Sequence, residues 1–328
     1  MSRPIDADDL ALMAAGFEAA MAGASDSREA EQSIHELGWA DLLDAAPARG
    51  AAMAFGALGA TGSAAGLLDD VVARALGIGV SLQTCVVLPA PHQAGPPARR
   101  RNEMGGGLVV NGLVSARAES ATAAVVAIAD EDGGGFARVD ASSLRRPAAG
   151  GVDPQNAYRR VSMEVPADAV TPLKTEAAWE SAVTAARAAL ACQLIAGARW
   201  MLAQARQHAL DRVQFGRPVA SFQSIRHKLA ESLVQIEGAA SVAEACWRDP
   251  DLLLARLAKA LAGQAALTAA AHAQQVLAGI GFTAEHRFHL RLKQVLVIDT
   301  LFGSARSLPA EIGRDLLIRG TAPRLIQL

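Results

Sequence analysis

The second half of the chain repeats apolar residues at the spacing of an α-helix. One row follows the pattern i, i+3, i+7, i+11, i+14 and consists of Phe222, Ile225, Leu229, Leu233 and Ile236. Such a row makes a single apolar stripe, which is stable only when the helix packs against other helices. Residues 176–213, 249–276 and 288–301 also show helical spacing, and Pro or Gly separates these segments. We therefore expect four long helices that form an antiparallel four-helix bundle.

The residues before this bundle divide into a helical region and a strand-rich region. Helical spacing is present at 6–21 and 27–43, and alanine, the residue with the highest helix propensity, is abundant up to residue 77. Short apolar runs rich in β-branched residues follow, separated by turn-forming residues such as those at 130–135, and they cover 80–88, 107–110, 123–129 and 161–165. The stretch 89–101 is rich in proline and arginine, so we expect it to be irregular. Ser221 is a plausible cap for the second bundle helix.

These patterns predict a fold class that is mainly α with a small β domain. The expected boundaries are 1–80 for an N-terminal helical domain, 81–172 for a middle β domain and 173–328 for the four-helix bundle domain. The low aromatic content of 4% argues against an all-β sandwich.

Charge and cysteine content exclude several classes of protein. The 31 basic and 33 acidic residues nearly cancel, so no global field favours nucleic acid or an anionic membrane. Cys85, Cys192 and Cys246 lack the spacing of metal ligands, which is typical of buried thiols in a reducing cytoplasm. The N-terminus has no apolar signal core, and no run of about 18 uncharged apolar residues occurs. We expect a soluble cytoplasmic protein that binds neither nucleic acid nor membrane.

Two short segments carry the most specific information. Residues 212–223 read RVQFGRPVASFQ and residues 275–285 read QVLAGIGFTAE. They resemble the R-x-x-F-G-x-x-x-x-x-F/H-Q and Q-x-x-G-G-x-G-F-T-x-E signatures of the acyl-CoA dehydrogenase family, flavoenzymes that introduce a 2,3 double bond into acyl-CoA thioesters. Ala278 replaces the first glycine of the second signature. Because each match supplies the context for the other, chance agreement is a poor explanation. The family's architecture also consists of a helical, a β and a helical-bundle part, the middle part resembling an abbreviated β-barrel here.

The resemblance implies that this chain contributes to a site for flavin adenine dinucleotide (FAD). Arginine meets paired phosphate oxygens with a planar fork of donors, and the family's residue matching Arg212 reaches the flavin of a neighbouring subunit. Glycine allows close backbone approach to the adenosine half of the dinucleotide. The cofactor-binding residues predicted in this way are Arg212, Phe215, Phe222, Gln223, Gln275 and Gly279.

The proton acceptor of the family is missing. Dehydrogenation needs a carboxylate within hydrogen-bond reach of the α-proton of the thioester. The two positions at which family members carry this glutamate fall on Phe302 and Ala186, so no catalytic residue is predicted. Asp299 is the nearest carboxylate, one turn before Phe302 on the predicted helix. The loops that hold the flavin ring in the family are also replaced, at residues 87–97 and 113–121.

Three functional hypotheses remain open. The first is a subunit of an α2β2 acyl-CoA dehydrogenase, in which a homologous partner supplies the glutamate and the ring-binding loops and shares the FAD. The resemblance implies a bulky acyl-CoA substrate, such as the steroid-derived ones of two-gene enzymes in the family, and an electron-transfer acceptor that reoxidises the flavin. The second is a self-sufficient homo-oligomeric flavin enzyme that uses Asp299 or another carboxylate as base. The third is a non-enzymatic assembly protein that uses the bundle for protein contacts.

Three other groups of residues resemble binding motifs but do not predict a further binding site. His286 and His289 lie close to Glu285, but a third ligand with the right spacing is missing, so no metal site is predicted. The glycines of residues 55–62 lack the strand and the spacing of a dinucleotide fingerprint. Residues 99–101 are three arginines that we interpret as a solvated loop, with contact to a CoA phosphate as the alternative.

Overall fold

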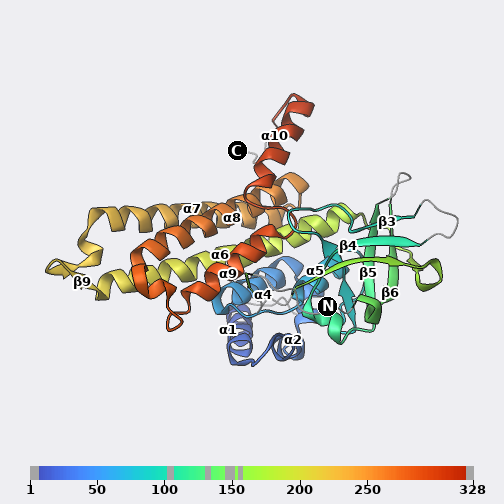
Figure 1. The fold of residues 1–328 in the computed structure, drawn as a ribbon, viewed down its shortest axis with the longest axis horizontal. Coiled ribbons are helices and arrows are strands. Elements are labelled where there is room, and N and C mark those ends of the chain that lie inside the picture. The colour runs from blue at the N-terminus through green and yellow to red at the C-terminus, as the bar shows by residue number, and fades with distance from the viewer. Residues whose placement is uncertain (1–6, 102–106, 130–133, 145–151, 154–157, 323–328) are drawn as a thin grey trace.

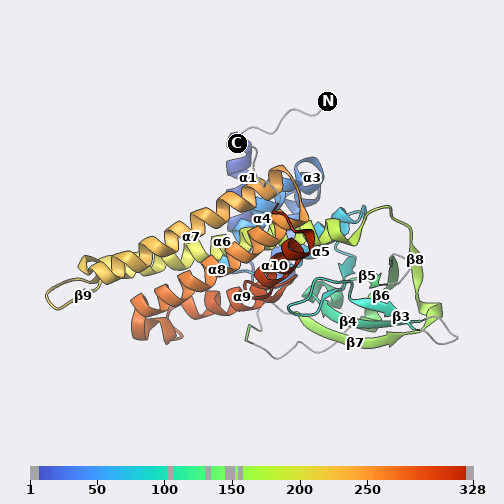
Figure 2. The same cartoon turned by 90° about the horizontal axis from the view of Figure 1, so that it is seen from above.

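The chain folds into helices, then a curled sheet, then a long bundle. The computed structural model describes residues 7–101, 107–129, 134–144, 152–153 and 158–322. Within these residues, the sheet lies at one end of an elongated bundle, and the first helices pack along the flank of the bundle next to the sheet (Figure 1, Figure 2). The expected fold class, mainly α with a small β domain, is confirmed. The expected domain boundaries stay predictions.

The N-terminal helices are α1 (Ala7–Gly23), α2 (Ser27–Glu36), α3 (Trp39–Ala45), α4 (Pro47–Thr61) and α5 (Leu67–Ala75). Asp26 caps α2, because its carboxylate accepts hydrogen bonds from two backbone N–H groups of the first turn. The single helix expected over 27–43 is wrong, since Gly38 has a left-handed φ of +86° and separates α2 from α3. Packing of α4 on α6 is close, because a Cβ at Gly59 would lie 2.3 Å from the carbonyl oxygen of Gln193.

The sheet contains the strands β1 (Thr84–Val86), β2 (Leu88–Pro89), β3 (Ala98–Arg100), β4 (Leu108–Val114), β5 (Ala123–Ala129), β6 (Gly135–Asp140), β7 (Arg159–Val165) and β8 (Thr171–Leu173). Its main path is β2-β4-β3-β5-β6-β8, with β7 paired to β4 and β1 paired to β5. The irregular structure expected up to residue 101 is wrong at β3, which joins β4 to β5 by pairing with both strands. Most of the turn expected over 130–135 lies outside the described residues. Short 3-10 turns lie at η1 (Ala116–Glu119), η2 (Ala141–Leu144) and η4 (Ala167–Ala169).

Four helices form the bundle, as the periodicity predicted. They are α6 (Trp179–Asp211), α7 (Gln223–Arg248), α8 (Leu252–Leu277) and α9 (Phe288–Thr300). Ser221 does not cap α7, because it lies in the 3-10 turn η5 (Val219–Ser221) and Phe222 takes the cap position. Asp251 caps α8 through its carboxylate. A further helix, α10 (Ser307–Arg319), projects from the side of the bundle (Figure 1).

The long bundle helices are apolar because they are central to the core. By length and composition alone, α6 and Leu252–Phe282 could each cross a membrane, but 78% and 56% of their apolar windows are buried inside the fold. The main core joins the N-terminal helices to α6, α8 and α9, and a second, smaller core fills the curl of the sheet. The bundle is therefore a rigid support for residues at its free end.

Candidate functional site

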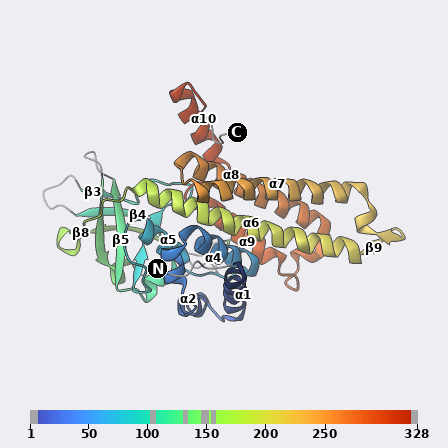
Figure 3. The same cartoon turned by 180° about the vertical axis from the view of Figure 1, so that it is seen from behind.

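The first motif forms the free end of the bundle. Arg212 directly follows α6, and the chain then turns through a hairpin of β9 (Val213–Gln214) and β10 (Arg217–Pro218). The two turn residues, Phe215 and Gly216, have φ angles of +53° and +77°. Positive φ at both central residues is the geometry of a type I′ turn, which matches the twist of a two-residue hairpin. This turn carries Phe215 to the tip, far from the sheet (Figure 1, Figure 3).

The aromatic side chains of this tip face solvent. Phe215 is 90% exposed and contacts Phe222 edge-on, with ring centroids 6.2 Å apart. Arg217 covers the other side of Phe222, with its guanidinium carbon 4.2 Å from the ring centroid. Further exposed apolar side chains at this end of the bundle are Leu210, Val213, Ile280 and Phe282. Exposed apolar side chains in such numbers are typical of a surface that another molecule covers.

Polar side chains beside these rings are available for a ligand. Arg212 and Gln223 are exposed, and Nε2 of Gln223 lies 3.3 Å from Nε2 of His227. Within the described part of the chain, the Arg212 guanidinium makes no hydrogen bond and no ion pair with a carboxylate. The backbone of Arg212 is fixed, because its carbonyl oxygen accepts a 2.8 Å hydrogen bond from the Val219 N–H. A free guanidinium on a fixed backbone is suited to bind an anion such as a pyrophosphate.

The second motif lies at the same end of the bundle. Gln275 is exposed in the last turn of α8, and Gly279 lies in the 3-10 turn η6 (Ala278–Phe282), with open space where a Cβ would be. The chain segments that flank the two motifs are close in space, since His208 lies near both Arg212 and His286. Partial burial lowers the pKa of His208, and the nearby charges of Arg212 and His286 lower it further. The structure thus places all six predicted cofactor-binding residues at one end of the bundle, and their role in binding FAD stays a prediction.

Ala278 has a backbone conformation that glycine would adopt more readily. Its φ of +51° and ψ of −131° lie outside the regions that L-residues favour. We expect Ala278→Gly to raise the free energy of unfolding by about 1 kcal/mol, because it relieves this strain. The control Ala271→Gly, at an exposed helical position of α8, should lower it by about 1 kcal/mol. Urea denaturation followed by circular dichroism measures the free energy of unfolding of both variants. If both variants were less stable than the unchanged protein, the idea that the backbone of Ala278 is strained would be wrong.

The histidines of the second motif have local structural roles. His286 Nδ1 accepts a 3.1 Å hydrogen bond from the Phe288 N–H, and His289 Nδ1 lies 2.8 Å from the His286 carbonyl oxygen. Among the described residues, no group of three His, Cys, Asp or Glu side chains could hold a metal ion.

The two positions of the missing glutamate meet in the bundle core. Ala186 and Phe302 are both buried, and the neighbouring Arg187 donates a 2.9 Å hydrogen bond from Nε to the Phe302 carbonyl oxygen. Phe302 lies beyond the end of α9, so the expectation that it shares a helix face with Asp299 is wrong. The Asp299 carboxylate accepts a 3.0 Å hydrogen bond from the Ala305 N–H and packs against α8 at Gly263. Asp299 therefore stabilises the turn after α9, and its use as a base in a self-sufficient enzyme stays a prediction.

Residues 113–121, which are expected to replace the second ring-binding loop, contain an ionic clamp formed by Arg117 with Glu31 and Asp70. Arg117 is buried, and its guanidinium donates hydrogen bonds to Glu31 and to both carboxylate oxygens of Asp70. Burial raises the pKa of Asp70, but the charge and hydrogen bonds of Arg117 outweigh burial and lower it to about 2. The adjacent Asp69, which accepts hydrogen bonds from Ser115 and the Val86 N–H, has a pKa raised by burial to about 7. This clamp joins the N-terminal helices to the sheet, and we did not predict it from the sequence.

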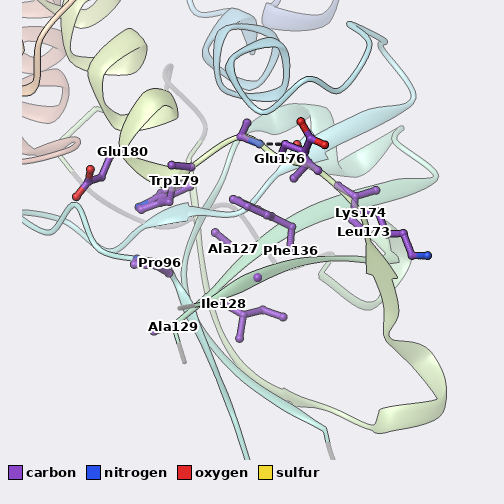
Figure 4. A pocket seen from close by; sticks show the side chains of 15 residues that line it. Pro96, Ala127, Ile128, Ala129, Phe136, Leu173, Lys174, Glu176, Trp179 and Glu180 are labelled. Carbon is purple, nitrogen blue, oxygen red and sulfur yellow. Dashed lines mark hydrogen bonds between the residues drawn. The ribbon is translucent and has the colours of Figure 1, made fainter. Parts of the chain in front are cut away.

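Two hollows lie between the sheet and the bundle. A cavity of about 290 Å³ between β4 and α9 is lined mainly by apolar residues, including Pro91, Leu113 and Val297. A cleft of about 1160 Å³ lies between β5, β6 and the start of α6, as Figure 4 shows.

Comparison with known proteins identifies the second half of the chain. Residues 177–317 match the domain described as "Acyl-CoA dehydrogenase, C-terminal domain". The acyl-CoA dehydrogenase IpdE2 of Mycobacterium tuberculosis is 40% identical over 130 residues, which are 39% of this chain and 39% of that protein. The match therefore spans well under half the length of this relative.

Solved structures extend the similarity to the whole fold. The Tcur3481–Tcur3483 steroid ACAD has a TM-score of 0.78 at 20% identity and covers 95% of this chain and 98% of its own. The ChsE4–ChsE5 complex from Mycobacterium tuberculosis has a TM-score of 0.73 at 20% identity and covers 98% of this chain and 99% of its own. At this identity the similarity establishes the fold.

Proposed function

For a chain that has the acyl-CoA dehydrogenase fold, and this family's C-terminal domain at residues 177–317, we propose the role of a subunit in an FAD-dependent acyl-CoA dehydrogenase. The reaction is the 2,3-dehydrogenation of an acyl-CoA thioester. The subunit contributes residues to a shared FAD, and a homologous partner supplies the catalytic carboxylate.

One contrast carries this proposal. The residues suited to the dinucleotide are exposed at the tip of the bundle, whereas both positions of the family's proton acceptor are buried and occupied by Ala186 and Phe302. A subunit arranged in this way can bind part of a cofactor at its outer surface but cannot take up the α-proton. Its reactive centre must be completed by a second chain.

The tip residues fit the chemistry of FAD. The Arg212 guanidinium would meet the pyrophosphate oxygens, and the rings of Phe215 and Phe222 would pack against the dinucleotide. Gln223, Gln275 and the open backbone at Gly279 would contact its remaining polar groups. When bound, FAD accepts the hydride that leaves the β-carbon of the substrate. The side chains of this chain bind and orient the cofactor and cover it from water.

The partner and substrate are proposed by similarity. One structural relative is a complex of two proteins, and the other combines two protein names and is described as a steroid ACAD. We therefore propose an α2β2 assembly that acts on a bulky, steroid-derived acyl-CoA and passes its electrons to an electron-transfer acceptor. The arginines of residues 99–101 stay candidates for contact with the substrate, together with the cleft beside them. Their positive charge is the evidence for this, and it is weaker than the evidence for the residues at the tip.

Co-expression tests this proposal directly. We expect the chain alone to be colourless and inactive. The complex with a homologous glutamate-containing subunit should show the visible absorbance of bound flavin and should reduce an artificial electron acceptor. Native mass spectrometry would give the subunit composition and the number of flavins. A yellow, active complex formed by this chain alone would reject the shared site and favour a self-sufficient enzyme. A colourless complex with the partner would favour an assembly role.

A further inference from the structure

The large cleft between the sheet and α6 ends abruptly at an aromatic side chain. Its described lining comes from β5, from β6 and from residues 173–180, which lead into α6. Trp179, the first residue of α6, lies on the bundle side of the cleft, and Pro96 and Phe136 lie nearer the sheet (Figure 4). A ligand that enters the cleft and points towards the bundle therefore meets the indole of Trp179.

Phe302 lies behind Trp179, in the bundle core. The two rings are 6.2 Å apart between centroids and inclined by 31°, and Phe302 is 1% exposed. Phe302 also has a left-handed φ of +55°, which a bulky residue adopts only at an energetic cost. A strained conformation of this kind persists only where the surrounding structure fixes it.

Two buried cations fix the turn that carries Phe302. Arg187 holds the Phe302 carbonyl oxygen, and Lys259 donates hydrogen bonds from Nζ to the carbonyl oxygens of Asp299 and Gly303, at 2.9 and 3.1 Å. These cations are 1% and 0% exposed. Because a buried cation is stable only when its donors are satisfied, both side chains resist any movement of the turn that would release the carbonyl groups.

A third segment closes the same region from the sheet side. The Trp179 indole donates a 2.8 Å hydrogen bond from Nε1 to the Ala94 carbonyl oxygen, and the His92 N–H donates a 2.7 Å hydrogen bond to the Thr300 carbonyl oxygen. Residues 92–94 belong to the segment that replaces the family's first ring-binding loop. The start of α6, the turn after α9 and this segment are thus bonded to one another around the two rings.

We infer that Phe302 and Trp179 form a plug at the bundle end of this cleft, which keeps an acyl chain out of the bundle core. Phe302 lies at the position of the lost base, and its ring fills the space beside that position. Arg187 and Lys259 hold the turn that carries this ring. An acyl chain cannot pass from the cleft into the bundle. This inference rests on the proposed function only for the choice of an acyl-CoA as probe.

Calorimetric titration of the full chain with CoA and with octanoyl-CoA tests the plug. In the unchanged protein the octanoyl chain should not increase the binding affinity, so CoA and octanoyl-CoA should bind equally tightly or not at all. In Phe302→Ala and in Trp179→Ala, octanoyl-CoA should bind at least tenfold more tightly than CoA, because removal of a buried ring leaves an apolar cavity that an alkyl chain can fill. Phe302→Leu, which keeps a buried apolar side chain, provides a milder opening if the alanine variants fail to fold.

Phe17→Ala is the matched control. Phe17 is also buried against a tryptophan, with the ring centroids of Phe17 and Trp39 6.4 Å apart, but it lies in α1 away from the cleft. It should lose stability without gaining any preference for octanoyl-CoA. A tenfold preference in the unchanged protein, or no preference in any folded Phe302 or Trp179 variant, overturns the plug. Flavin content with the partner subunit is measured separately, so failure of the proposed function would be recognised independently.

Discussion

Replacing Arg117 by methionine is expected to lower the free energy of unfolding by about 3–5 kcal/mol, the typical cost of breaking a buried ion pair. The guanidinium is 3% exposed and hydrogen-bonds Glu31 and Asp70, which are themselves buried. Methionine has a similar length but no charge, so both buried carboxylates would lose their arginine, and Asp70 would keep its contacts with His35 and Trp39. The change can be measured by urea denaturation of the full chain.

Arg199→Met is the control for this prediction. Arg199 pairs with Glu237, but both side chains are about half exposed, at 51% and 55%. Water and salt screen such a pair, so we expect a loss of no more than about 1 kcal/mol. The double neutralisation Glu31→Gln with Asp70→Asn should recover part of the stability of Arg117→Met, since it removes the uncompensated charges. Equal losses in Arg117→Met and Arg199→Met would show that burial of the clamp has no energetic consequence.

The clamp explains how a chain without a ring-binding loop keeps its sheet in place. Arg117 lies in η1, shortly after β4, in the segment expected to replace the family's loop against the flavin ring. Its guanidinium also points towards the carbonyl oxygens of Ser81 and Thr84, where the chain enters the sheet. One side chain therefore connects α2, α5, β1 and β4. The contacts of Arg117 thus hold the N-terminal helices and the sheet together from within the protein.

Regular periodicity made much of the fold predictable. The strand expected over 123–129 is β5 with the same bounds, and the four bundle helices lie where the spacing placed them. Local propensity could not predict β3, because Ala98–Arg100 forms a strand only through pairing with two neighbours. Nor could it predict the break at Gly38, where helical spacing continues across a left-handed residue. These features depend on tertiary contacts rather than on the residues themselves.

The candidate site also has features that the local sequence predicts and features that depend on distant residues. The motifs predicted which residues belong together at the bundle tip, because each motif is short and local. Arg117 was missed because its partners Glu31 and Asp70 are 86 and 47 residues away. A signal was nevertheless present: Asp69 and Asp70 interrupt the apolar helix LLDDVV, and two carboxylates at positions that the pattern buries require a cation or hydrogen-bond donors. The sequence shows that Ala186 and Phe302 occupy the two family positions, whereas the ring packing at Phe302 required the structure.

Replacing Arg212 by alanine is expected to weaken flavin retention by the assembled complex by roughly tenfold to a hundredfold. Hydrogen bonds to a charged group contribute about 1.5–3 kcal/mol, and about 1.4 kcal/mol corresponds to a factor of ten. The Arg212 guanidinium is exposed and makes no ion pair with a carboxylate in the described part of the chain, so its removal should leave the fold intact. The absorbance ratio of flavin to protein after gel filtration at decreasing concentration measures the effect.

Two further variants show whether the loss comes from phosphate recognition. Arg206→Ala removes an exposed arginine from α6 less than two turns earlier and should leave flavin content unchanged. Arg212→Lys keeps the charge but loses the planar pair of donors, so it should restore only part of the retention. Native mass spectrometry must show an intact complex in each case, which separates loss of cofactor from loss of the partner. Full retention of flavin by an intact Arg212→Ala complex would remove the cofactor role of the tip and leave it as a surface for protein contacts.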